Sequence, residues 1–199
     1  MAVTRERFEQ GMSYDEYKAQ MTRNQERFAT NERQLELDPG DAAAFTRLPR
    51  PLNVLVLAED WCGDVIDNLP ILGRVAAASD KLNLRVFLRD QNLDLIDQYL
   101  NRGEFRSIPV FVFFDDAFSE VGRFIERPES VTARRDVQRR EISLQHPEFG
   151  APDTPISQLP EEPRAALMQA MAAARSASKR TDNAEVVRAL REIVERVQV

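Results

Sequence analysis

One stretch of the sequence, Ala58-Glu59-Asp60-Trp61-Cys62-Gly63-Asp64-Val65, contains the only cysteine among the 199 residues. The run before it, residues 52–57, is apolar and rich in branched side chains, which is typical of a strand buried on both faces. The segment after it, residues 64–79, carries apolar side chains at helical spacing, although Pro70 lies inside it and should kink it. Cys62 is therefore expected where a buried strand turns into the start of a helix.

The sequence around Cys62 acts on its thiol in two opposing ways. Unpaired backbone N–H groups and the positive end of the helix dipole favour a thiolate at a helix N-terminus. Glu59, Asp60 and Asp64 are close in sequence, and negative neighbours raise the pKa of a thiol. The net direction is left open by the sequence, and we interpret Glu59 and Asp60 as solvated loop acids.

The residues that follow predict an α/β order of elements. Further strands are expected at residues 83–88, 110–114 and 119–125, with the last two joined as a hairpin. A helix is expected at residues 93–102, where Gly103 closes it. The first two strands should be parallel, because a helix connects them.

Helical segments are predicted on both sides of this core. Residues 1–50 form a polar N-terminal extension, with one long helix from a capping box at Ser13 to about Leu37. Residues 51–145 form the predicted α/β domain, whose last helix begins at Pro128.

A proline-rich stretch separates the domain from the end of the sequence. Its prolines predict a poorly regular linker over residues 146–163. Residues 164–199 form a predicted helical C-terminal extension of two helices, at residues 164–178 and 184–197. The second of these helices carries an apolar stripe that begins at Val186.

The composition favours a globular protein in a reducing compartment. A net charge of −6 argues against nucleic acid or an anionic membrane as partner. No apolar run is long enough for a transmembrane helix, and the first residues do not predict a signal peptide. One cysteine cannot form an internal disulfide, so we expect a cytoplasmic protein with a free thiol at Cys62. One cysteine and one histidine without a spaced ligand pattern predict no metal site.

Two motifs in residues 52–125 carry a family resemblance. Trp61-Cys62-Gly63-Asp64 follows a predicted strand, and Ser107-Ile108-Pro109 precedes another. With the longer phrases Leu88–Leu95 and Arg106–Pro109, they resemble the thioredoxin-like superfamily, in particular bacterial thioredoxin family proteins with a single-cysteine motif and helical additions. The resemblance implies an α/β thioredoxin-like fold, a central mixed sheet flanked by helices, with helical N- and C-terminal extensions.

The resemblance also implies the roles of the motif residues. Cys62 would be the nucleophile, with Trp61 shielding one side of the sulfur, Gly63 leaving its approach open and Asp64 beside it. The thioredoxin-like pattern implies a cis peptide bond before Pro109 and a substrate paired with the backbone of Ile108.

Two apolar residues replace groups that thioredoxin-like sites commonly use. Val65 occupies the position of the second cysteine, and Val56 occupies the position of a buried acid. The first hypothesis is therefore monothiol thiol-disulfide exchange through Cys62, an oxidoreductase activity on a disulfide-containing protein or a small thiol. An external low-molecular-weight thiol, such as glutathione or bacillithiol, would act as co-substrate, and no bound cofactor is expected. The alternative is a redox-inactive binding or adaptor module whose helical extensions form a homodimer.

Overall fold

The computed structural model describes residues 3–197. Within them the chain divides into two compact units, one of residues 3–127 and 186–197 and the other of residues 128–185. The last helix, α8 (Glu161–Glu195), contributes to both units. All six predicted site residues lie in the first unit.

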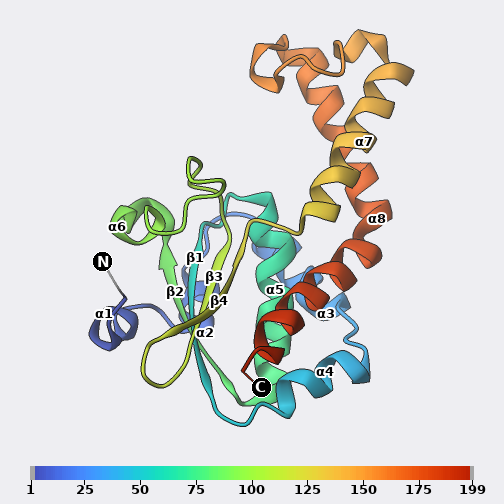
Figure 1. The fold of residues 1–199 in the computed structure, drawn as a ribbon. Coiled ribbons are helices and arrows are strands. Elements are labelled where there is room, and N and C mark those ends of the chain that lie inside the picture. Colours follow the sequence, from blue (N-terminus) through green and yellow to red (C-terminus); the bar gives the residue numbers. More distant parts are fainter. Residues whose placement is uncertain (1–2, 198–199) are drawn as a thin grey trace. The chain divides into compact units, whose positions relative to one another are not determined.

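A four-stranded mixed sheet in the order β2-β1-β3-β4 lies at the centre of the first unit (Figure 1). Its strands are β1 (Leu52–Ala58), β2 (Leu82–Leu88), β3 (Val110–Phe114) and β4 (Glu120–Ile125). β1 pairs in parallel with β2 and antiparallel with β3, and β3 and β4 form the antiparallel hairpin. The predicted mixed sheet, parallel first pair and hairpin are confirmed.

The two central strands fix the end of the sheet at which the motif residues lie. Every residue of β3 and all but one residue of β1 are buried, as their apolar runs predicted. Because β1 and β2 run together and β3 runs against them, the ends of β1 and β2 lie beside the start of β3. The cysteine motif and the Ile108–Pro109 motif therefore meet at this end.

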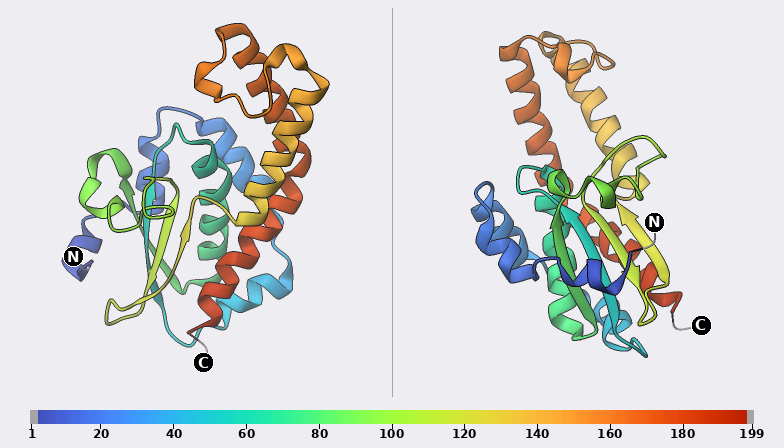
Figure 2. Two further views of the ribbon diagram at one scale, coloured as in Figure 1. Left: turned by 45° about the horizontal axis from the view of Figure 1, so that its top comes forward. Right: turned by 90° about the vertical axis from the view of Figure 1, so that its left-hand side faces the viewer.

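Helix α5 (Gly63–Ser79) follows β1 in the chain and runs beside the sheet (Figure 2). Of the apolar residues at helical spacing, Ile66, Leu69, Leu72 and Val75 are buried and Ala76 is partly buried. Pro70 lies inside this helix. Helices α3 (Gln25–Gln34) and α4 (Pro39–Thr46) pack against α5. The cysteine motif is thus joined to two large buried elements, a central strand and a central helix.

Residues 3–50 of the N-terminal extension form four helices, and the prediction of one long helix from Ser13 to about Leu37 is wrong. Helices α1 (Arg5–Glu9) and α2 (Tyr14–Gln20) precede α3 and α4. The predicted capping box does begin α2. Helix α2 ends at Gln20. The chain turns before α3, whose N-cap Asn24 has a left-handed backbone with φ of 56°.

The segment between β2 and β3 is also less helical than predicted. Instead of a helix at residues 93–102, the structure has a 3₁₀ turn, η1 (Arg89–Gln91), and the single turn α6 (Leu93–Ile96). Arg102 and Gly103 have φ of 54° and 74°, so the chain reverses there rather than continuing a helix.

The last turns of α8 belong to the core of the first unit. The predicted apolar stripe is confirmed, since five of its members are buried, namely Val186, Val187, Leu190, Ile193 and Val194. Ile193 packs on β4 at Gly122, where an added Cβ would lie 3.0 Å from its side chain.

The second unit contains α7 (Glu129–Gln145), two 3₁₀ turns, η2 (Pro147–Phe149) and η3 (Ile156–Gln158), and the first part of α8. The prediction of two C-terminal helices is wrong, because α8 is continuous from Glu161 to Glu195. No glycine or proline interrupts residues 164–195, and within the expected gap, residues 179–183, Asp182 accepts from the Ser178 hydroxyl and pairs with Arg134 of α7.

Candidate functional site

Cys62 is the N-cap residue of α5. Its backbone is extended, with φ of −84° and ψ of 121°, and Gly63 is the first helical residue. The Cys62 N–H donates to the carbonyl of Glu59 at 3.2 Å, and its own carbonyl accepts from Ile66 at 3.1 Å. The thiol is half-buried, at the junction of strand and helix that the sequence predicted.

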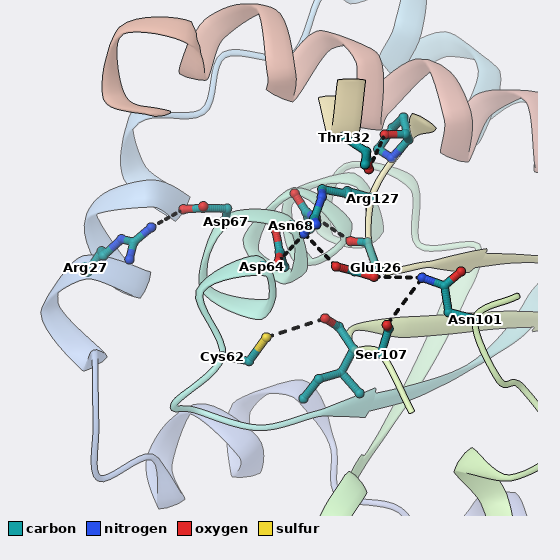
Figure 3. A network of polar contacts seen from close by, with 12 residues as sticks. Arg27, Cys62, Asp64, Asp67, Asn68, Asn101, Ser107, Glu126, Arg127 and Thr132 are labelled. Atoms are coloured by element: carbon teal, nitrogen blue, oxygen red, sulfur yellow. Dashed lines mark hydrogen bonds and ion pairs between the residues drawn. The ribbon is translucent and has the colours of Figure 1, made fainter. Parts of the chain in front are cut away.

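The sulfur faces the Ile108–Pro109 motif (Figure 3). The Cys62 thiol donates to the carbonyl oxygen of Ile108, with Sγ and O 3.5 Å apart. The peptide bond between Ile108 and Pro109 is cis. Since only the protonated thiol can make this hydrogen bond, the contact favours the thiol over the thiolate.

The surroundings raise the pKa of Cys62 above its ordinary value. Burial is the largest cause, and the negative charges of Asp64 and Glu126 act in the same direction. The N–H groups of Val65 and Asp64, in the first turn of α5, act in the opposite direction and lower the pKa. The question that the sequence left open is thus answered, because the surroundings of Cys62 raise its pKa and favour the protonated thiol.

Exposed apolar side chains gather at the same end of the sheet. Trp61, Leu93 and Phe105 are 44%, 43% and 53% exposed, and they follow β1, follow β2 and precede β3 respectively. The guanidinium of Arg89 lies over the Trp61 ring at 5.2 Å and donates to the carbonyl of Arg106 at 2.9 Å. The loops around Cys62 are therefore tied together and offer apolar surface to a partner.

Glu126 connects the motif residues to the rest of the site, and no local sequence pattern singles it out. Its N–H donates to the carbonyl of Pro109 at 2.7 Å, and its own carbonyl accepts from the Asn68 amide at 2.8 Å. Its carboxylate accepts from Asn101 at 2.7 Å and pairs with Arg127 at 2.7 Å. Glu126 has a φ of 60°, a backbone conformation that these four contacts hold.

Asp64 joins this network from α5. Its carboxylate pairs with Arg127 at 2.5 Å, and both side chains are mostly buried. Asn101 also donates to the hydroxyl of Ser107 at 3.3 Å, one residue before Ile108 (Figure 3). The network therefore fixes the start of α5, which carries Cys62, relative to the Ile108–Pro109 motif. A single sequence cannot reveal it, because its members lie far apart in the chain.

The interpretation of Glu59 as a solvated loop acid is wrong, whereas Asp60 is partly exposed and hydrogen-bonded. Glu59 is only 8% exposed and accepts from the N–H of Asp90 at 2.8 Å. Burial raises the pKa of Glu59, partly offset by this hydrogen bond. For Asp60, burial is outweighed by hydrogen bonds from Thr22 and Arg23, so its pKa is lowered.

The two apolar replacements are core residues. Val65 and Val56 are both fully buried. Neither side chain can attack a disulfide, donate a hydrogen bond or move a proton. At the positions where a dithiol site would keep its second thiol and its acid, this chain has core packing instead.

Two features of other classes of protein are absent from residues 3–197. No group of three or more His, Cys, Asp or Glu side chains is arranged to hold a metal ion in that range. No helix within it has the length and apolar content needed to cross a membrane.

The sequence matches the thioredoxin family over residues 11–138, which is more than half of the chain. The chain belongs to the thioredoxin family. The match covers α2 to α4 as well as the sheet, so the family pattern includes most of the N-terminal helices of this thioredoxin-family protein. No curated protein matches the sequence significantly.

Two solved structures share the fold of this thioredoxin-family protein. A crystallised HIV epitope-scaffold has a TM-score of 0.65 at 19% identity, with 98% of each chain covered. A protein of unknown function from Pseudomonas aeruginosa has a TM-score of 0.59 at 22% identity, with 89% of this chain and 99% of the other covered. At these identities the two likenesses show the α/β thioredoxin-like fold alone.

Proposed function

We propose that this thioredoxin-family protein carries out monothiol thiol-disulfide exchange through Cys62. The observation that carries the proposal is the position of the thiol, 3.5 Å from the carbonyl of Ile108 and at the N-terminus of α5. A helix N-terminus stabilises a thiolate once it forms, and the half-buried sulfur can be reached from solvent.

The reaction has two displacement steps. The Cys62 thiol loses its proton to solvent, and the thiolate attacks one sulfur of the substrate disulfide. A new bond forms from Sγ to that sulfur, the substrate S–S bond breaks, and the leaving thiolate takes up a proton. An external thiol then attacks the substrate sulfur of the mixed disulfide, which releases Cys62 and leaves the substrate joined to that thiol.

The external thiol is required because the described residues offer no second thiol. Cys62 is the only cysteine of the sequence, and Val65 fills the position of a resolving thiol with a buried side chain. A low-molecular-weight thiol suits this step, since the sulfur lies at the edge of the core. The cytoplasm, where such thiols are abundant, is the compartment in which we place the reaction.

A disulfide-containing protein suits the first step. The exposed side chains of Trp61, Leu93 and Phe105 surround the end of the sheet at which Cys62 lies. Apolar surface of this kind is typical of a site that binds another protein. We therefore propose that the disulfide is presented on a polypeptide, whose backbone passes beside Ile108.

A second function, a redox-inactive binding module, is favoured by one observation. The raised pKa of Cys62 leaves little thiolate at neutral pH. Exposed apolar side chains on α7 and α8, at Val137, Leu144 and Met168, would then serve contacts with a partner or a second copy.

The test is to trap the adduct. The wild-type protein and a Cys62→Ser variant are incubated with glutathione disulfide or with a disulfide-containing peptide, quenched with acid and weighed intact. Monothiol exchange predicts one adduct per chain, on Cys62, and none on the variant. If no adduct forms while the Cys62→Ser variant keeps its oligomeric state and its protein partners, the binding module is the better account.

A further inference from the structure

One arginine bridges the two loops that meet at the thiol. The guanidinium of Arg89, which follows β2, lies over the Trp61 ring at 5.2 Å and donates to the carbonyl oxygen of Arg106 at 2.9 Å. Trp61 directly precedes Cys62 in the chain. Arg106 lies two residues before Ile108, whose carbonyl oxygen accepts from the thiol at 3.5 Å. Arg89 therefore contacts a near neighbour of each residue in the contact between sulfur and carbonyl.

The side chain of Arg89 suits a positioning role. It is mostly buried, and an ion pair with Asp90 at 2.6 Å compensates its charge. A planar guanidinium can lie flat on an aromatic ring and donate hydrogen bonds from its edge at the same time. An apolar side chain can do neither, and a lysine ammonium lacks the planar shape. Arg89 is therefore the group that orients the Trp61 ring.

The Trp61 ring is held at the surface rather than packed in the core. It remains 44% exposed, although burial of an aromatic side chain is favourable. The guanidinium covers one face of the ring and leaves the rest of its surface to solvent. An exposed ring held in a fixed orientation offers apolar surface to a molecule that approaches the thiol.

The covalent geometry of a mixed disulfide brings part of the substrate to this ring. Two α-carbons joined through a disulfide lie about 4.4–6.8 Å apart, and consecutive α-carbons of a chain lie about 3.8 Å apart. A residue next to the substrate cysteine is therefore within side-chain reach of Trp61, the residue next to Cys62. Glutathione has no apolar side chain beside its cysteine, whereas a polypeptide can have one. The ring can thus distinguish the two kinds of disulfide.

We propose that Arg89 is a positioning residue that holds the Trp61 ring for an apolar side chain beside the cysteine of a polypeptide disulfide. The proposal rests on monothiol exchange as the function of Cys62 and names the substrate class of that site. It gives Arg89 a role in specificity that the cysteine and proline motifs do not include.

The first measurement uses the emission of Trp61, the only tryptophan of the chain. The probes are two short peptides with one S-methylated cysteine, flanked by leucine and phenylalanine in one peptide and by serines in the other. Arg89→Leu removes the guanidinium, while the Asp90 N–H still joins the loops through its bond to Glu59 at 2.8 Å. The wild type should bind the apolar peptide about tenfold more tightly than the polar one, and Arg89→Leu should bind both equally.

Arg123→Leu is the matched control. Arg123 lies over the Tyr99 ring, also at 5.2 Å, and pairs with Glu120 at 2.7 Å. This variant should keep the tenfold preference, whereas Arg89→Lys, which keeps the charge without the planar group, should reduce it to about threefold. Thermal unfolding checks that each variant folds, and Arg89→Lys decides the question if Arg89→Leu does not. A preference absent from the wild type, retained in full by the Arg89 variants or equally lost in Arg123→Leu would overturn the proposal.

Rates of adduct formation separate the role of Arg89 from monothiol exchange itself. The two peptides, now as disulfides, and glutathione disulfide are each reacted with Cys62 and followed by intact mass. Arg89→Leu should react about tenfold more slowly with the apolar peptide disulfide and at most about twofold more slowly with glutathione disulfide. An equal loss with both would overturn the proposal, since Arg89 would then act on the thiol. If the wild type forms no adduct with any disulfide, monothiol exchange fails, and the peptide titration still decides whether Arg89 positions the ring.

Discussion

Replacing Val65 with cysteine should convert the one-thiol site into one that releases its own adduct. Val65 lies three residues after Cys62, in the first turn of α5, and its N–H already faces the sulfur. Valine and cysteine differ by about one buried carbon, so Val65→Cys should cost roughly 1 kcal/mol, within a typical folding free energy of about 5–15 kcal/mol. The variant should therefore fold.

The assay follows the mixed disulfide on Cys62 after excess reagent has been removed. In the wild type the adduct should persist without added thiol. In Val65→Cys it should decay at least about 100-fold faster, because a well-placed intramolecular thiol acts at a very high effective concentration. Val65→Ser, similar in size and unable to form a disulfide, is the control. An adduct on folded Val65→Cys that lasts as long as the wild-type adduct would refute the reasoning about this position.

Three further predictions concern the acids and packing around the site. Glu59→Gln keeps the oxygen that accepts from the Asp90 N–H, so urea unfolding at pH 7 should show a stability equal to or greater than that of the wild type. The reason is that the raised pKa of Glu59 makes the stability of the wild type fall as the pH rises through that pKa. A clear loss of stability in Glu59→Gln at pH 7 would contradict the prediction. Asp60→Asn should destabilise the fold by about 1 kcal/mol at pH 7. Because the pKa of Asp60 is lowered in the folded protein, the greater stability of the wild type is present above about pH 4 and is lost as the pH falls through the folded pKa. A difference in stability between the two proteins that persists at pH 2 would contradict the prediction. Gly73→Ala should lower the melting temperature, because its Cβ would lie 2.3 Å from the Tyr14 ring; an unchanged value would show that α2 can move away from α5.

The elements of the sheet were predictable because their signals are local. The apolar run of β1, the hairpin of β3 and β4, and the apolar stripe that begins at Val186 each depend on residues close in sequence. The capping box at Ser13 is equally local and begins α2 as predicted.

The helix boundaries failed where distant contacts decide them. The break between α2 and α3 depends on hydrogen bonds to Asp60, 36 to 38 residues away in sequence. In α8 the opposite occurred, since no residue breaks the helix between the two segments that were expected.

The candidate site, too, was predicted where its signals are local and missed where they are not. The two motifs predicted that Cys62 and Ile108 would meet, and the structure places them in contact. Glu126 was missed, because nothing in its local sequence distinguishes it from a surface residue. Its contacts with the site become visible only after the strands are placed in space.

The most direct measurement of monothiol exchange is the release of a purified Cys62 adduct. The wild-type mixed disulfide is prepared, freed of small molecules and followed by intact mass, with and without increasing concentrations of glutathione. The account predicts an adduct that is stable alone and released at a rate proportional to the added thiol. Release at the same rate without any added thiol would contradict it.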